Sequence, residues 1–319
     1  MKKKKTSHLE VIRSKNKNYI VTIAIGKKFF NDWTIFAKKN WVKYCKNNSL
    51  GLIVIKDHII DKSNPFWKKP TWQKMLIGSY LKKHYKSKIT NVCYLDSDIL
   101  VNPFAPNVFK YHNKKKISLV SMINNLPFDL NKVRKIISFY RNKFYSKKYP
   151  LDSSIFMNLQ QLYKFHKLKV QKDFACAGFF VFNIKYFAET MEQWFFKYKK
   201  NIKTLTGGGD QPIFNYEAFN TKKVKLLNYK FQALWIYEMS NKYNFLYKFK
   251  KNKNKVIKDC IEASLLENYF LHFAGSWYEG HMWKIKNILD DKSYKNNLKL
   301  NKYLRIKSSG KSIGRILPK

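Results

Sequence analysis

The chain contains 319 residues, 45% of them apolar, and its 64 basic against 20 acidic side chains give a formal net charge of +44. This length and apolar content are enough to bury a substantial core, in one large domain or two small ones. The charge favours anionic partners such as phosphates and anionic lipid headgroups. The lysines are dispersed and no arginine-rich arm is present, which argues against a specific nucleic-acid binder.

Cysteine usage and hydropathy indicate a reduced, intracellular protein. The cysteines at positions 45, 93, 176 and 260 lie far apart, with no CxxC pair and no zinc-type histidine spacing. No apolar segment reaches the length of a transmembrane helix, and the basic start is not followed by the apolar core of a signal peptide. We therefore expect a cytoplasmic protein, with any membrane contact peripheral.

Strands and helices alternate along the chain, as in α/β proteins. Short apolar runs rich in β-branched and aromatic residues predict strands at 19–26, 50–57, 91–95, 117–122, 175–183, 224–227 and 269–273. Apolar residues at helical spacing predict helices at 31–47, 71–85 and 185–200, a short helix near Val108, and another helix opening at Asp210.

The remaining segments are expected to be less regular. Residues 1–18 are basic and polar and should form a flexible arm before a single domain at 19–290, which a basic tail at 291–319 follows. Inside the domain, residues 123–172 show no steady period, so we expect an insertion there with one or two helices. The lysine-rich stretch at 248–258 is expected to be a loop.

Two carboxylates follow directly on the buried strand at 91–95. Asp96 and Asp98 are separated by one residue, so a turn at the end of the strand lets their oxygens converge on one point. Mg²⁺ and Mn²⁺ take such oxygen ligands, and open α/β sheets bind ligands at this edge. In the competing interpretation one Asp caps the next element and the other is solvated. The apolar strand before the pair and the turn at Pro103 favour the metal site.

Four sequence marks occur in a fixed order: YLDSDILVNP at 94–103, ACAGFFVFN at 175–183, GGGDQPIFN at 207–215 and YFLHFAGSW at 269–277. Together they resemble the nucleotide-sugar-dependent glycosyltransferases of the GT-A fold, most closely family 8 and its relatives, over about residues 19–284. The resemblance implies a Rossmann-like α/β fold with a mixed sheet flanked by helices. It also implies that the insertion at 123–172 lies on the acceptor side.

The resemblance assigns a metal site and a diphosphate site. Asp96 and Asp98, with Ser97 between them, match the pair that holds Mn²⁺ or Mg²⁺ and, through the ion, the donor diphosphate. His272 matches the late histidine that completes the metal ligands, although a lone histidine in an aromatic strand is more often a core residue. Gly275 matches a glycine whose backbone approaches a phosphate.

The resemblance also assigns residues around the sugar and the nucleoside. Asp210 and Gln211 match the pair near the sugar and its reacting carbon. The segment Ala24, Ile25 and Gly26 would line the base and ribose, and Lys74 matches a basic donor-binding residue.

The chain departs from the family pattern in two places. Cys176 stands where the family commonly has Asn, which puts a sugar contact in doubt. The family's Lys after the HxxG motif is missing at Tyr278, and Lys284 lies farther along, where it could serve the same diphosphate.

The resemblance implies a hexosyltransferase with a UDP-sugar donor and a glycan or lipid-linked saccharide acceptor. A cation beside the leaving diphosphate would stabilise the charge that develops there. If the reaction inverts, Asp210 would deprotonate the acceptor hydroxyl. If it retains configuration, as the family-8 resemblance suggests, Asp210 positions the sugar and the leaving phosphate takes the proton.

Two other functions compete with this interpretation. The LDSDI segment resembles the opening of haloacid-dehalogenase-type phosphatases, but those enzymes carry the motif on the first strand and need a later acidic cluster. A basic, aromatic-rich nucleic-acid-binding protein would need clustered basic residues and a known motif. The dispersed lysines and the converging carboxylates favour the transferase.

Overall fold

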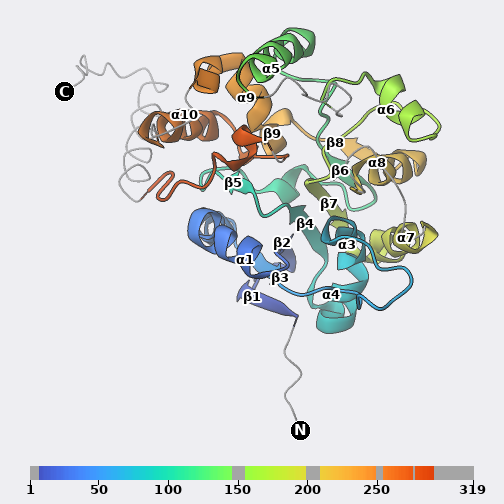
Figure 1. Ribbon diagram of the computed structural model, residues 1–319. Coiled ribbons are helices and arrows are strands. Elements are labelled where there is room, and N and C mark those ends of the chain that lie inside the picture. The colour runs from blue at the N-terminus through green and yellow to red at the C-terminus, as the bar shows by residue number, and fades with distance from the viewer. Residues whose placement is uncertain (1–6, 146–154, 199–208, 249–253, 276, 291–319) are drawn as a thin grey trace, which may run out of the picture.

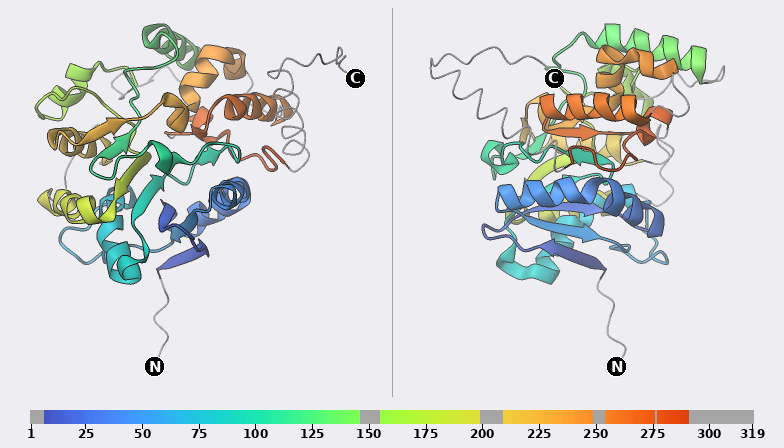
Figure 2. Two further views of the ribbon diagram at one scale, coloured as in Figure 1. Left: turned by 180° about the vertical axis from the view of Figure 1, so that it is seen from behind. Right: turned by 90° about the vertical axis from the view of Figure 1, so that its left-hand side faces the viewer.

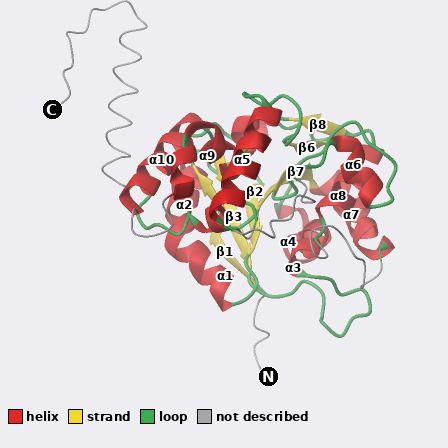
Figure 3. Ribbon diagram, turned by 45° about the horizontal axis from the view of Figure 1, so that its top comes forward, coloured by secondary structure: helices red, strands yellow, loops and turns green. Residues whose placement is uncertain are grey.

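The computed structural model describes residues 7–145, 155–198, 209–248, 254–275 and 277–290. Among them, seven strands form a mixed sheet in the order β1-β3-β2-β4-β7-β6-β8, and three form a small sheet in the order β5-β10-β9 (Figure 1). The strands are β1 His8–Ile12, β2 Asn18–Ile23, β3 Gly51–Ile55, β4 Asn91–Leu95, β5 Ile99–Val101, β6 Ile117–Leu119, β7 Phe179–Asn183, β8 Val224–Leu226, β9 Ala233–Leu234 and β10 Phe270–His272. Helices flank the sheets, so the predicted α/β fold with a mixed sheet is confirmed (Figure 3).

Helices occur where they were predicted. They are α1 Lys27–Asp32, α2 Lys38–Asn47, α3 Pro70–Gln73, α4 Ile77–Tyr85, α5 Leu130–Phe144, α6 Leu159–Phe165, α7 Ile184–Lys197, α8 Gln211–Asn220, α9 Trp235–Lys242 and α10 Asn254–Glu267. Of these, α9 and α10 are additional helices that were not predicted from the sequence. A π-helical turn at Trp33–Ala37 joins α1 to α2, and a 3₁₀ turn at Lys74–Leu76 joins α3 to α4. No helix among these combines the length and the apolar character that crossing a membrane requires.

The inner strand β2 is buried on both faces. It pairs in parallel with β3 and β4, with Tyr19 opposite both Gly51 and Val92. Because side chains alternate along a strand, Ile20 packs into the cluster of α1 and α2, whereas Val21 packs into the cluster of α4 and α7. The core therefore consists of two apolar layers, one on each face of the sheet.

The small sheet joins the carboxyl-terminal part to the main sheet. β5 pairs antiparallel with β10, and β9 pairs parallel with it. Figure 2 shows the amino-terminal strands and helices on one side of the molecule and α9 and α10 on the other, with β4 and β7 between them. The carboxyl end of β4 thus faces the small sheet, which brings the Asp96 segment close to His272.

Two predicted segments differ from the structure. Residues 8–12, expected in a flexible arm, form the edge strand β1, which pairs antiparallel with β3 through His8 and Ile55. The predicted loop at 248–258 becomes α10 from Asn254, because the apolar side chains of Ile257, Ile261 and Leu265 repeat every four residues and are buried.

Other element predictions agree more closely. The insertion at 123–172 contains α5 and α6, as expected. The strands predicted at 117–122 and 175–183 are shorter at one end, covering Ile117–Leu119 and Phe179–Asn183. The predicted tail at 291–319 and the first six residues of the predicted arm lie outside the described residues.

Candidate metal centre and adjoining cavity

Three side chains with metal-binding atoms meet where β4 ends. Asp96 follows β4, Asp98 precedes β5, and His272 is the last residue of β10. The antiparallel register sets Ile99 opposite His272, so Asp98 stands beside the imidazole. His272 Nε2 lies 3.3 Å from Asp98 Oδ1 and 3.8 Å from Asp96 Oδ2. The convergence predicted from the sequence is therefore present in the fold.

This cluster fits a divalent cation. One ligand atom from each of the three residues lies within 4.8 Å of the others. Asp98 Oδ1 is buried and finds no hydrogen-bond partner among the described residues, so a cation would satisfy it. Two carboxylate oxygens and an imidazole nitrogen suit Mn²⁺, and the carboxylates alone also suit Mg²⁺.

His272 is enclosed on its other side. The side chain is 2% exposed, and its Nδ1 lies 3.2 Å from Gln232 Nε2 and 3.5 Å from Cys176 Sγ. Burial opposes a positive charge on the ring, but the neighbouring Cys176 sulfur and Asp98 carboxylate outweigh it and raise the His272 pKa above its ordinary value. Cys176 thus contacts the histidine from the side opposite to the carboxylates.

Lys74 carries a buried positive charge beside the cluster. Its Nζ donates to the Ala177 carbonyl at 2.9 Å and lies 3.3 Å from Asp210 Oδ2 and 3.6 Å from Asp96 Oδ1. Burial disfavours the charge, but the two carboxylates outweigh it and raise the pKa of Lys74. The lysine therefore stays protonated and links the metal cluster to Asp210.

Asp210 and Gln211 open α8 at the back of the cluster. Asp210 occupies the cap position, but its side chain makes no cap hydrogen bond. It is 4% exposed, and this burial raises its pKa, while Lys74 pulls in the opposite direction. Gln211 Oε1 accepts a hydrogen bond from the Ala177 amide at 3.2 Å. Asp210 therefore pairs with Lys74 instead of capping the helix.

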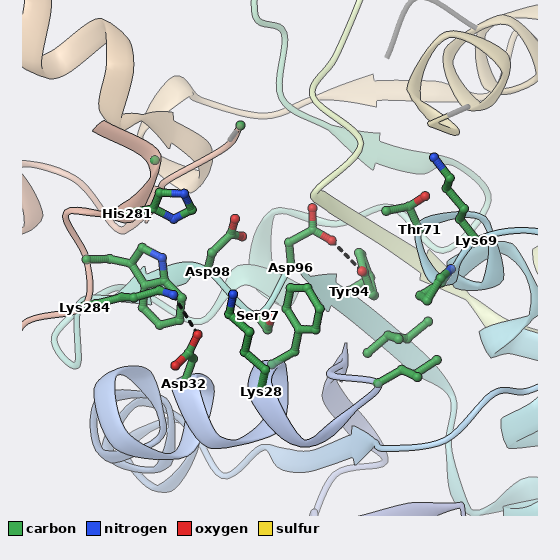
Figure 4. A pocket seen from close by; sticks show the side chains of 17 residues that line it. Lys28, Asp32, Lys69, Thr71, Tyr94, Asp96, Ser97, Asp98, His281 and Lys284 are labelled. Carbon is green, nitrogen blue, oxygen red and sulfur yellow. Dashed lines mark hydrogen bonds and ion pairs between the residues drawn. The ribbon is translucent and has the colours of Figure 1, made fainter. Parts of the chain in front are cut away.

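A cavity of about 530 Å³ lies against the metal cluster. Figure 4 shows Asp96, Ser97 and Asp98 in its middle, with His281 and Lys284 on one side and Lys69 and Thr71 on the other. Most of the exposed lining is apolar, and the carboxylates of Asp96 and Asp98 lie near its centre. This combination is typical of small-molecule sites.

The structure places half of the predicted site residues in the lining of this cavity. Those that line it are Ile25, Asp96, Ser97, Asp98, Gly275 and Lys284. Gly275 has a φ of 103°, a conformation that favours glycine. Lys284 Nζ lies 2.8 Å from Asp32 Oδ2, an ion pair drawn in Figure 4.

Two of the expected nucleoside contacts lie elsewhere. Ala24 is fully buried in the core, and Gly26, which precedes α1 with a φ of 93°, lies outside the cavity lining. Lys74, Asp210 and His272 stand behind the cavity lining, in the buried layer around the cluster. Gln211 is half-buried beside them and also lies outside the lining.

Sequence reasoning missed several lining residues. One is Phe29, which is 58% exposed on α1, and Lys28, Asp32 and Trp283 also line the cavity. Phe29 lies three residues after the glycine that ends the first predicted strand. Because ligands bind beyond the carboxyl ends of strands, that position was the signal that could have found it.

No protein-family model matches this chain, and no curated protein matches it by sequence. Among solved structures, it is similar to a glycosyltransferase involved in the glycosylation of the major capsid of PBCV-1, with a TM-score of 0.46 and 9% sequence identity. The superposition covers 83% of this chain and 98% of that one. Likeness at this level assigns neither a family nor an activity.

Proposed function

We propose that this chain is a metal-dependent glycosyltransferase, which moves a sugar from a UDP-sugar to a glycan or lipid-linked saccharide. The observation that carries the proposal is the meeting of Asp96, Asp98 and His272 beside a cavity of about 530 Å³. That volume falls within the usual range of small-ligand pockets, and the converging carboxylates supply what a metal-bound diphosphate requires.

Different surfaces of the cavity suit different parts of the donor. Ile25 and Phe29 offer apolar surface for a base, and the carboxylate cluster faces the position of the diphosphate. Gly275 and Gly280 come close together, since a Cβ on Gly280 would meet the Gly275 carbonyl oxygen at 2.5 Å. Such bare backbone lets a phosphate approach closely.

Charge stabilisation is the main chemical contribution of the site. When bound to Asp96, Asp98 and His272, Mn²⁺ or Mg²⁺ would supply positive charge to the leaving diphosphate. Lys284, now paired with Asp32, lines the same cavity and can turn to the diphosphate as its charge develops. These groups favour departure of the nucleoside diphosphate.

The buried ion pair favours retention of configuration. Lys74 holds Asp210 as an ion pair in the buried layer, so this carboxylate is poorly placed to take a proton. We propose that Asp210 and Gln211 orient the sugar, and that the leaving diphosphate accepts the proton of the acceptor hydroxyl.

Donor binding tests the proposal directly. A panel of nucleotide sugars should be titrated by calorimetry into the wild-type protein, with Mn²⁺ and with chelator, and into Asp98→Ala. We expect a UDP-sugar to bind with Mn²⁺ and to lose about tenfold or more in affinity with chelator or in Asp98→Ala, because both remove the cation that holds the diphosphate. Transfer and hydrolysis of the sugar should follow the same pattern.

Asp57→Ala is the matched control. Asp57 is an exposed carboxylate just beyond β3, which is separated from β4 by one strand. It lies outside the cavity lining. Its replacement should leave donor affinity unchanged. If no nucleotide sugar binds, and Asp98→Ala behaves like the wild type, the transferase proposal is wrong.

A further inference from the structure

We propose that Gln232 is a positioning residue, which holds His272 in the tautomer that binds a cation through Nε2. The inference rests on the metal centre of the proposed function. It assigns a role to a buried amide that contacts neither the cavity nor the carboxylates.

The two nitrogens of His272 face different surroundings. Nε2 points at the carboxylate oxygens of Asp98 and Asp96, at 3.3 Å and 3.8 Å, so Nε2 is the atom that a cation would take. Nδ1 faces away, toward the Gln232 amide at 3.2 Å and the Cys176 sulfur at 3.5 Å. Cys176 is not part of the group of metal-binding atoms.

The proton on the ring determines which nitrogen can bind. A neutral imidazole carries one N–H, and a cation on Nε2 needs the lone pair there, so the proton must sit on Nδ1. This N–H then needs an acceptor, since metal-binding histidines usually donate their second nitrogen. This hydrogen-bond acceptor must come from a residue that contacts Nδ1.

Gln232 has the acceptor that Nδ1 requires. Its Oε1 is buried and has no hydrogen-bond partner among the described residues. The oxygen and nitrogen of a side-chain amide are placed by their contacts, and half a turn about the last side-chain bond exchanges them. With the oxygen toward Nδ1, the amide accepts the ring N–H. The sulfur of a cysteine such as Cys176 is a weaker acceptor than an amide oxygen.

The backbone holds Gln232 in this place. The residue ends the 3₁₀ turn Tyr229–Gln232, whose start is capped by the side chain of Asn228. It leads into β9, which pairs in parallel with β10 so that Leu234 lies opposite His272. Gln232 is 2% exposed, and the strand pairing fixes its distance from the histidine.

Metal affinity of the protein without nucleotide tests this role. Mn²⁺ binding should be measured by electron paramagnetic resonance for wild type, Gln232→Met and Gln232→Glu. Methionine keeps the length of the side chain but has no comparable acceptor, so we expect affinity to fall about 10- to 100-fold. Glutamate restores an acceptor, and its affinity should match or exceed that of the wild type.

Gln73→Met is the matched control. The Gln73 amide contacts the His58 ring in the same way, with Nε2 2.8 Å from Nδ1, but this pair lies outside the metal cluster. Its loss should leave Mn²⁺ affinity unchanged. Melting of every variant in chelator shows whether it is folded. If Gln232→Met does not fold, Gln232→Glu decides, since reduced affinity there overturns the proposal.

A second measurement reads the tautomer itself. In the ¹⁵N-labelled wild type with diamagnetic Mg²⁺, long-range proton correlations should show His272 protonated at Nδ1. Protonation at Nε2 in the metal complex, unchanged Mn²⁺ affinity in Gln232→Met, or no metal binding by the wild type would each overturn the inference. Metal binding that follows the expected pattern without any affinity for nucleotide sugars supports this inference and refutes only the transferase proposal.

Discussion

Gly178 lies where the metal cluster leaves no room for a side chain. A Cβ there would meet His272 Cε1 at 2.3 Å and Asp96 Oδ2 at 2.6 Å, so at least one of these groups would have to move. Its backbone is outside the positive-φ region, so alanine adds little strain of its own. We expect Gly178→Ala to weaken Mn²⁺ binding about tenfold or more, measured by calorimetry. Unchanged affinity would show that the ligands tolerate the shift.

At the scale of single residues, the sequence predicted the parts of the site that are local. Asp96 and Asp98 follow a buried strand, so their convergence could be inferred from spacing and strand geometry. His272 was predicted only from the family resemblance, because its partners are more than 170 residues away along the chain. The contacts of Gln232 and Cys176 with the ring could not be inferred, since they depend on how β9, β7 and β10 pack.

A buried ion pair ties α5 to the segment after β10. The Arg141 guanidinium bonds the Glu279 carboxylate, with both side chains at most 3% exposed, and lies 5.2 Å from the centre of the Trp277 ring. Glu279 belongs to the turn Tyr278–His281, which supplies Gly280 and His281 to the cavity. The insertion helix therefore supports one wall of the candidate donor site.

We expect Arg141→Met to reduce the free energy of unfolding by about 3–5 kcal/mol, because it leaves the buried Glu279 carboxylate without its partner. Urea denaturation measures the change. The matched control is Lys82→Met, which removes a solvent-exposed pair with Glu189 and should change the free energy of unfolding far less. Equal effects of the two substitutions would mean that the buried pair contributes nothing specific.

At the scale of elements, contiguous apolar runs predicted the buried strands of the main sheet but not the short strands β5 and β9. Polar and lysine-rich segments led to the wrong predictions at β1 and α10. β1 alternates polar and apolar residues and becomes a strand only because β3 offers it an open edge, a partner about 45 residues away. The start of α10 resembles a charged loop, and its apolar face needs the small sheet to be buried. Segments whose structure depends on distant partners are the ones that local patterns miss.

Buried histidines make the stability of the whole molecule sensitive to acid. Burial lowers the pKa of His8, His58, His112 and His166. The effect is largest at His112, where burial and the nearby Lys225 lower the pKa from 6.5 to about 4. His112 Nδ1 contacts Ser118 Oγ at 2.8 Å, which suits a neutral ring. The pKa of His272 is raised instead, so titration of this residue changes the stability only above pH 6.5.

Because unfolded His112 binds its proton near pH 6.5 and the folded residue near pH 4, the unfolded chain holds more protons between these values. The contribution of His112 to the free energy of unfolding is therefore fully present above pH 6.5. It decreases as the pH drops toward 4, by at most about 3 kcal/mol. We expect His112→Asn, which retains a polar atom near Ser118, to flatten the pH dependence of unfolding measured with urea between pH 7 and 4.5. If the wild type and the variant lose stability in parallel, His112 is not the group that titrates.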